Sequence, residues 1–280
     1  MKLSLFDKIV THLLLLLAVC AAVFPILWIV STSFKERNDV YQTTRIELIP
    51  PKPSLDAYRE VLTMNNGIFM RWFANSVMVA GVTALIGVLL AAGAAYAFSR
   101  FKFRGKRPMI FFFLLTQMFP GAVLLVPLYF LLARAGILGT FTGLILAYST
   151  VGLPFGVWML KGYFDTIPQT LDEAGIVDGL SLFGVFWRIV VPLSLPGIAV
   201  TAFFTCLTAW NEYMFALAFM TGEQNYLLPV GMAAAFGDQY QTFWSLMAAA
   251  SVLTTLPVLI VFVLAQKFLV GGLTQGGVKG

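Results

Sequence analysis

The stretch that determines the fold class runs from Phe73 to Arg107 and reads FANSVMVAGVTALIGVLLAAGAAYAFSRFKFRGKR. Residues 73–98 contain no charged side chain, and ~20 mostly apolar helical residues are enough to cross a bilayer. Five Lys and Arg side chains follow within residues 99–107, which marks a cytoplasmic loop under the positive-inside rule. The sequence therefore predicts a membrane-spanning helix whose carboxyl end faces the cytoplasm.

The composition of the whole chain also indicates a membrane protein. Of its 280 residues 59% are hydrophobic and only 11% are charged, whereas a soluble domain carries about 25% charged residues. The mean hydropathy of +0.87 excludes an ordinary cytosolic enzyme, a disordered chain and a fibrous repeat. The 18 basic residues are dispersed without an aromatic stacking platform, so we expect a lipid bilayer and no nucleic acid as partner.

Five further apolar windows predict an all-α, polytopic bundle of six transmembrane helices, forming a single domain over residues 1–280. The predicted spans are 11–33, 73–98, 108–132, 142–161, 197–220 and 244–266. An even number of spans places both termini in the cytoplasm, together with Lys2 and Lys267. The outer loop 34–72 carries six basic residues of its own, but they are widely spread and mixed with acids, so the dense loop 99–107 decides the orientation.

Two local patterns add detail to this bundle. Gly87, Ala91 and Ala95 recur at four-residue spacing in the second span, and small residues at this spacing let a neighbouring helix approach closely. In the outer loop, a cluster of prolines precedes the segment 54–62. Its residue Ser54 can cap a helix, so this segment is predicted to form a short surface helix.

The chain offers little material for catalysis or metal binding. Cys20 and Cys206 each lie inside an apolar run, and the one histidine, His12, stands at the head of the first span. No GxxxxGK[ST] phosphate loop occurs and no span holds paired carboxylates. We therefore expect no enzyme activity, no bound metal or cofactor, and energy supplied by a partner. A membrane-embedded enzyme and an ion-coupled transporter are the alternatives from other classes.

The cytoplasmic segment 162–196 is too long for a simple connection and predicts two short helices. In the first, Asp172 and Glu173 lie near the positive amino-terminal end, and Gly179 is placed to end the helix in a left-handed conformation. In the second, Ser181 can cap, and an apolar stripe is expected along the headgroup layer or under the bundle. The stripe consists of Phe183, Phe186, Trp187 and Val190. Two interpretations are open: a knob that docks another protein, or a hairpin that covers the bundle.

This segment resembles the EAA loop of ABC importer permeases, EAA-x3-G-x9-I-x-L-P. Every spacing is kept, and the departures are Gly175 for the second alanine and Val191 for leucine. The glycine is expected to loosen the helix by up to ~1 kcal/mol. The resemblance implies a coupling helix that sits in a groove of a cytoplasmic ATPase subunit. The implied coupling residues are Glu173, Ala174, Gly175, Asp178, Gly179, Ile189 and Pro192.

Motifs elsewhere resemble the carbohydrate-uptake branch of that family, and within it the smaller permease subunit of importers for maltose and related oligosaccharides. They are Asn75-Ser76, Ala95–Arg100, Leu153-Pro154-Phe155, Ala209–Tyr213 and the ending from Gly272 to Gly280. The resemblance implies a multi-pass subunit of a prokaryotic plasma (inner) membrane that translocates a sugar of the maltose or trehalose type by alternating access. It also implies a second permease subunit, two copies of an ATPase that binds ATP and Mg²⁺, and a solute-binding protein. A permease of this family for another solute class is the alternative within the same machinery.

The acidic residue that stands well inside a predicted span is Glu212, ~20 Å along the fifth helix at 1.5 Å per residue. Because a carboxylate in lipid is costly, Glu212 is predicted to face a protein interior or a wet cavity. Two roles are open for Glu212. It is expected either to hydrogen-bond sugar hydroxyls, with Trp210 or Tyr213 stacking on the sugar ring, or to form a structural hydrogen bond to the sister permease. The substrate-path candidates are Gln117, Thr208, Trp210, Asn211, Glu212 and Tyr213, with Thr205, Tyr148 and Ser149 as weaker ones.

The outer loop 221–243 is long for a connection between spans and rich in polar and aromatic residues. This composition predicts contact with an extracytoplasmic sugar-binding protein through Tyr226, Asp238 and Tyr240. The Gly-rich tail that begins at Gly271 either reaches the ATPases or is a disordered end.

Overall fold

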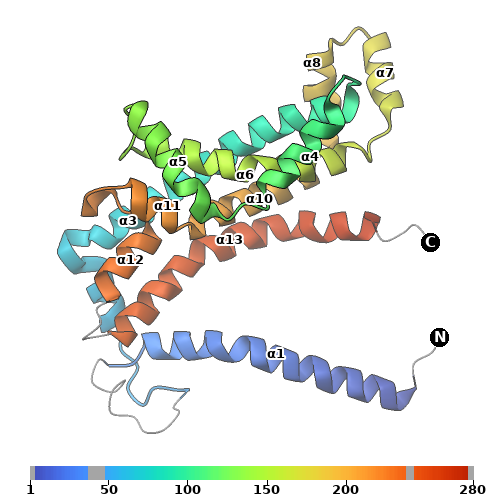
Figure 1. Cartoon of the computed structure of the whole chain (residues 1–280). Helices are drawn as coiled ribbons and strands as arrows, with labels where there is room; N and C mark the ends of the chain where they lie inside the picture. The colour runs from blue at the N-terminus through green and yellow to red at the C-terminus, as the bar shows by residue number, and fades with distance from the viewer. Residues whose placement is uncertain (1–3, 37–47, 238–242, 277–280) are drawn as a thin grey trace. The chain divides into compact units, whose positions relative to one another are not determined.

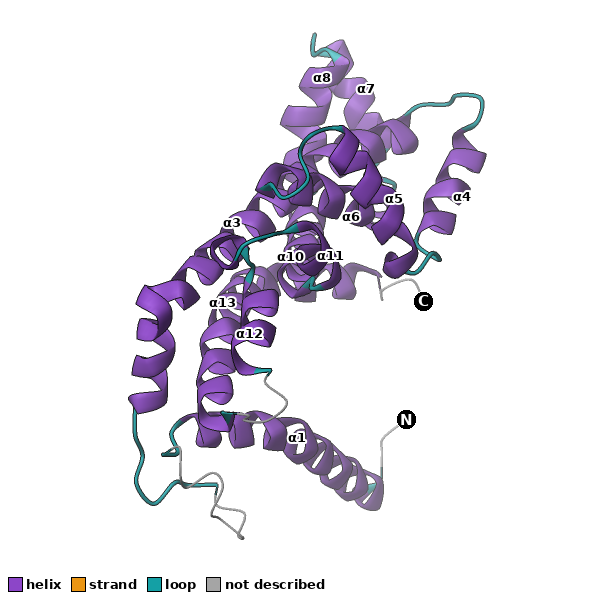
Figure 2. Cartoon of the chain, turned by 60° about the vertical axis from the view of Figure 1, so that its left-hand side comes forward, coloured by secondary structure: helices purple, strands orange, loops and turns teal. Residues whose placement is uncertain are grey.

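The computed structural model describes residues 4–36, 48–237 and 243–276, and within these ranges every regular element is a helix (Figure 2). The prediction of an all-α fold is therefore confirmed. The chain divides into two compact units, residues 1–70 with 231–256, and residues 71–230 with 257–280. The prediction of one domain over the whole chain stays a prediction.

Among the residues that the structure describes, four helices are long and apolar enough to cross a membrane, and two bent helix pairs bring the number to six if each pair is one span. The continuous helices are α1 (Leu5–Ser33), α3 (Asp56–Arg100), α6 (Phe141–Phe164) and α13 (Trp244–Gly276). The first bent pair is α4 (Lys106–Thr116) with α5 (Gly121–Arg134), and the second is Leu182–Leu193 with α10 (Leu195–Asn211). The six-span count agrees with this arrangement.

The predicted third span, 108–132, is not one continuous helix, because α4 and α5 meet at an angle of 102°. Pro120 lies directly before α5 with an extended ψ of 134°. A proline has no backbone N–H and disfavours the helical conformation in the residue before it, so the helix stops here and restarts.

The predicted fifth span, 197–220, is also interrupted. Helix α10 ends at Asn211, Glu212 is extended, and the short helix α11 (Met214–Phe219) follows. At the other end of the chain, α13 continues to Gly276, so the first part of the Gly-rich tail is helical rather than disordered.

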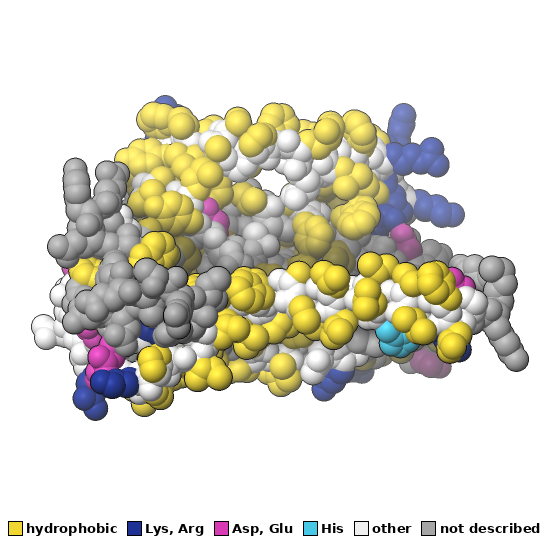
Figure 3. All heavy atoms as spheres, turned by 90° about the horizontal axis from the view of Figure 1, so that it is seen from below, with side chains coloured by type: hydrophobic (Ala, Val, Ile, Leu, Met, Phe, Trp, Pro, Cys, Tyr) yellow, Lys and Arg dark blue, Asp and Glu magenta, His cyan; other side chains and the backbone are white. Residues whose placement is uncertain are grey.

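The first unit contains α1 and the predicted surface helix. Hydrophobic side chains cover the face of the helix that carries the single histidine (Figure 3), and none of the apolar window of α1 is buried. The surface helix forms the start of α3, where the Asp56 amide donates to the Ser54 hydroxyl at 3.0 Å. The helix breaks at residues 64–67, where Asn65 and Asn66 have positive φ, so the spanning part of α3 begins before the predicted residue 73.

In the second unit, α3 packs closely against α6 and α10 through its small residues. A Cβ atom added to Gly156 of α6 would lie 3.0 Å from Ala91, and one added to Gly87 would lie 3.3 Å from Thr205 of α10. Ala95, one turn further along α3, is fully buried. The predicted close approach along this stripe is confirmed.

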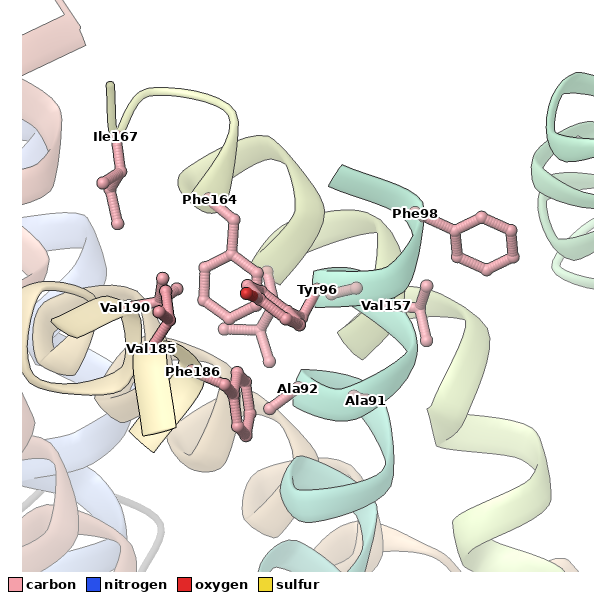
Figure 4. Close-up of a cluster of buried hydrophobic side chains, with 12 residues drawn as sticks. Ala91, Ala92, Tyr96, Phe98, Val157, Phe164, Ile167, Val185, Phe186 and Val190 are labelled. Carbon is pink, nitrogen blue, oxygen red and sulfur yellow. The ribbon is translucent and has the colours of Figure 1, made fainter. Parts of the chain in front are cut away.

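The carboxyl-terminal ends of α3 and α6 share a buried apolar cluster with the segment that follows α6 (Figure 4). The Tyr96 ring lies 5.0 Å from the Phe186 ring, and Phe164, Val185 and Val190 pack around them. This cluster holds the hairpin, residues 165–194, at one end of the unit, where its helices α7 (Gln169–Val177) and α8 (Leu182–Val185) lie side by side (Figure 1).

Candidate functional site

The turn after α7 is fixed by Gly179. This residue has φ +87°, which glycine adopts without strain, and its amide donates to the Ile176 carbonyl at 3.0 Å. The Leu180 amide donates to the Gly175 carbonyl at 2.9 Å. These two bonds form a Schellman motif, so the prediction that Gly179 ends the helix in a left-handed conformation is confirmed.

The second arm of the hairpin begins as predicted but departs from the predicted stripe. The Ser181 hydroxyl accepts the Gly184 amide at 3.1 Å and caps α8. A π-helix, η1 (Phe186–Val190), follows and changes the helical register. Phe186 and Val190 are therefore buried, whereas Phe183 and Trp187 are 71% and 43% exposed, and the prediction of one apolar stripe over four residues is wrong.

The motif residues of α7 separate into an inner and an outer face. Gly175 faces the second arm, where an added Cβ atom would lie 2.5 Å from the Ile189 side chain. The outer face carries exposed residues of mixed polarity, and Val177 on it is 87% exposed. This face consists of Leu171, Glu173, Ala174, Ile176, Val177 and Asp178, and we call it the α7 outer face. Pro192, on the other arm, is also exposed.

A buried ion pair that the sequence analysis missed joins the hairpin to the end of α3. The Arg100 Nε atom donates to the Asp172 carboxylate at 2.6 Å, and the two side chains are 6% and 11% exposed. The Arg100 guanidinium also donates to the carbonyls of Phe164 and Ile167, each at 3.1 Å. Beside it, the Ser99 hydroxyl donates to Asp165 at 2.7 Å.

A second feature of this unit is a cavity of about 280 Å³ between α3, α6 and α10. Its polar lining is Thr83, Gln117, Tyr148, Thr205, Thr208 and Glu212, and Phe155, Phe204 and Phe215 supply aromatic walls. We call it the polar cavity. It brings together Gln117, Thr208 and Glu212 of the predicted substrate path.

Glu212 has a structural role that neither predicted interpretation included. Its two carboxylate oxygens accept the amides of Phe215 and Ala216 at 2.8 and 3.1 Å. The carboxylate thus caps α11 within its own chain, where the positive end of the helix stabilises the charge.

Thr83 and Tyr148 line the same cavity, and their buried hydroxyls have no hydrogen-bond partner among the described residues. Thr83 was missed by the sequence analysis, although it precedes Gly87, Ala91 and Ala95 at the same four-residue spacing.

Three predicted substrate-path residues lie elsewhere. Trp210 is buried, packs edge-on against Phe73 at 6.0 Å, and lines a separate apolar cavity of about 180 Å³. Asn211 and Tyr213 are exposed and do not line the polar cavity, and the Asn211 amide donates to its own helix at Leu207. Neither Trp210 nor Tyr213 therefore lines the polar cavity with Glu212, and the prediction that one of them stacks on a sugar ring stays a prediction.

At the far end of the spanning part of α3, three side chains hold the segment 223–228. Trp72 donates to the Glu223 carbonyl at 2.7 Å, and Asn75 donates to the Gln224 and Tyr226 carbonyls at 3.1 and 3.0 Å. The Ser76 hydroxyl accepts the Leu228 amide at 2.8 Å. Tyr226 is partly exposed, while Asp238 and Tyr240 of the predicted binding-protein contact lie outside the described residues.

These features were compared with known proteins. The model of the family described as "Binding-protein-dependent transport system inner membrane component" matches residues 84–275. The chain belongs to this family. It is therefore a membrane-embedded permease of a transport system that depends on a binding protein.

Individual relatives agree with this assignment. The permease is 37% identical over 257 residues to the inner membrane ABC transporter permease protein YcjP of Escherichia coli, covering 92% of this chain and 91% of that protein. It is 38% identical over 288 residues to the maltose/maltodextrin transport system permease protein MalG of Escherichia coli, covering 97% and 95%.

The fold also matches a solved structure. A chain in the crystal structure of a bacterial ABC transporter involved in the import of the acidic polysaccharide alginate is 25% identical, with a TM-score of 0.82. The match covers 95% of the permease and 99% of that chain.

Proposed function

We propose that this permease forms the membrane path for a sugar and that partner ATPases drive it through the hairpin. The α7 outer face is the observation that carries this proposal: an exposed surface of apolar, small and acidic residues on a helix fixed at both ends by its own chain. Exposed apolar side chains grouped on one soluble helix are typical of a docking surface. The occupant is an ABC ATPase, which supplies the ATP and Mg²⁺ chemistry that this chain has no phosphate loop to perform.

The orientation follows from the two ends of α3. Arg100, which belongs to the basic loop 99–107, contacts the hairpin. The positive-inside rule places this end in the cytoplasm, where ATP is available. The segment 223–228, held at the other end, then faces the outside, and both termini lie in the cytoplasm. The membrane is the inner membrane of a prokaryote.

The substrate class rests on relatives and on the polar cavity. MalG carries maltose and maltodextrin in its name, and the alginate importer takes up a polysaccharide. The polar cavity combines hydroxyl groups, the Gln117 amide and the Glu212 carboxylate with aromatic walls, which suits ligands with many hydroxyls. We propose an oligosaccharide of the maltose or trehalose type, a solute-binding protein that delivers it, a second permease and two ATPase copies.

The test is ATP-driven uptake into vesicles that contain the complete complex purified from its native membrane. Labelled maltose and trehalose are expected to accumulate only with ATP inside and binding protein outside. Labelled amino acids serve as the competing solute class. Uptake driven by an ion gradient without ATP, or amino-acid uptake without sugar uptake, would contradict the proposal.

A sharper test of the polar cavity uses its unpartnered hydroxyls. Replacing a buried hydroxyl that has no partner is expected to leave stability unchanged or raise it by up to ~1–3 kcal/mol, because no bond is lost on folding. If the sugar uses these hydroxyls, Thr83→Val and Tyr148→Phe each weaken its apparent affinity roughly 2- to 10-fold, the equivalent of one net hydrogen bond. Thermal unfolding and the KM for uptake are measured together.

Ser149→Ala is the matched control for these two variants. Its hydroxyl is also buried and has no hydrogen-bond partner in the described part of the chain, but Ser149 does not line the polar cavity. The control is expected to leave the KM unchanged. Equal KM values for all three variants and the wild type would remove the polar cavity from the sugar path.

The outer segment 223–226 gives a prediction for the binding protein. Asn75→Ala removes two hydrogen bonds to this segment and is expected to loosen it and to lower the stimulation of ATP hydrolysis by binding protein at least ~5-fold. Met78→Ala, at an exposed position of the same helix, is the control. Stimulation that survives Asn75→Ala unchanged would show that the binding protein does not depend on this segment.

A further inference from the structure

We propose that Arg100 is a positioning residue for transport: it fastens α7 to the ends of α3 and α6, so that movement imposed on α7 is passed to the spans. This inference rests on the proposed function, because it requires an ATPase that moves the hairpin. It adds an internal fastening point that is separate from the α7 outer face.

The geometry of Arg100 is that of a three-way junction. Its Nε atom bonds Asp172 on α7, its Nη1 atom bonds the carbonyl of Phe164 at the end of α6, and its Nη2 atom bonds the carbonyl of Ile167 in the connection. Arg100 itself is the last residue of α3. One planar guanidinium therefore joins two long helices and the hairpin, and a lysine ammonium cannot reproduce this fork.

Burial makes the junction sensitive to change. Arg100 and Asp172 are both shielded from water. Removing one partner of a buried ion pair strongly lowers the stability of the folded protein, because the other charge is left buried and unpaired. The second oxygen of Asp172, Oδ1, is buried and has no hydrogen-bond partner among the described residues. The Asp172 carboxylate thus relies on the Arg100 guanidinium, and α7 cannot leave this position without separating the pair.

A neighbouring tether is weaker. Asp165 accepts hydrogen bonds from Ser99 at 2.7 Å and from Lys161 at 2.5 Å, but its side chain is 44% exposed. Exposed ion pairs are screened by water and contribute little. Asp165 also lies before α7 begins, so it holds the connection rather than the helix that meets the ATPase.

The experiment compares basal ATP hydrolysis with hydrolysis stimulated by maltose-loaded and trehalose-loaded binding protein, in the complete complex in vesicles. Arg100→Lys keeps the charge and removes the fork. The double variant Arg100→Met with Asp172→Leu removes both charges, so that no buried charge is left unpaired and folding is preserved. Arg104→Gln, which changes an exposed cation of the same basic loop, is the control.

We expect both junction variants to assemble with the ATPases and to hydrolyse ATP at the basal rate. The ratio of stimulated to basal ATP hydrolysis is expected to decrease by a factor of about 5 to 150 in both variants, the usual range of coupling between two sites. Arg104→Gln is expected to keep the wild-type ratio. A role in stability alone would lower the amount of complex and leave the ratio of stimulated to basal rate unchanged, and that result would overturn the inference. A wild-type complex that neither sugar stimulates would overturn the proposed function, and this inference with it.

Discussion

Gly179→Pro is expected to abolish ATP-dependent sugar uptake while the chain still inserts into the membrane. Gly179 has φ +87°, and proline is confined to about −65°. The variant also loses the amide that donates to Ile176. The Schellman motif cannot form, so the end of α7 and its outer face are displaced. Uptake is expected to fall on the order of 100-fold, near the upper end of typical coupling between sites.

The control for this prediction is Gly179→Asn. Asparagine tolerates a left-handed conformation better than other residues with a side chain, and its amide can still donate to Ile176. We expect this variant to keep most of the uptake. Membrane insertion is checked by the amount of each variant in the washed membrane fraction. Normal uptake by the proline variant would show that the turn after α7 has no part in coupling.

Ala174→Arg is the second change with a large expected effect, this time on assembly. Ala174 lies on the α7 outer face between Glu173 and Val177. A long charged side chain placed in the middle of a packed interface must be accommodated or desolvated, and central interface positions commonly account for 2–4 kcal/mol. The apparent affinity of the permease for the ATPase is therefore expected to fall about 30- to 1,000-fold. The measurement is the amount of ATPase that is recovered with the purified permease.

Two measurements make this prediction specific to docking. Ala174→Ser keeps a small side chain and is expected to recover the ATPase as the wild type does. The thermal unfolding of the Ala174→Arg permease without ATPase is expected to match the wild type, because Ala174 is exposed in this chain. Full recovery of the ATPase with Ala174→Arg would place the docking surface elsewhere.

Features set by local chemistry could be predicted from the sequence. Gly179 and Ser181 stand at helix boundaries whose hydrogen bonds involve residues within five positions, and both were placed correctly. The small residues of α3 also fall on one face by spacing alone, and the structure packs that face against α6 and α10. Helix caps and helix faces depend on near neighbours, so a sequence pattern contains enough information to find them.

Features that depend on contacts between distant residues could not be predicted from the sequence. Arg100 and Asp172 are 72 positions apart, and within the sequence each had a sufficient local explanation, one as part of a basic loop and the other as an acid near a helix start. The break at Glu212 was missed for the opposite reason: an apolar run looks continuous even where a carboxylate accepts the backbone amides three and four residues further along the chain. The π-helix at Phe186–Val190 likewise shifts a stripe that a regular helical period predicts.

The spanning part of α3 is bonded to other segments at both ends. Trp72, Asn75 and Ser76 hydrogen-bond the segment 223–228 at one end, and Arg100 pairs with Asp172 at the other. From Trp72 to Arg100 the helix rises ~42 Å at 1.5 Å per residue, more than the ~30 Å hydrocarbon core. In the orientation proposed above, a displacement produced by the binding protein at Trp72–Ser76 is passed to Arg100, on the proposed ATPase side, along one continuous helix. A mutation that introduces a flexible break into α3 between Trp72 and Arg100 would leave the contacts at both ends intact but remove the mechanical coupling between them.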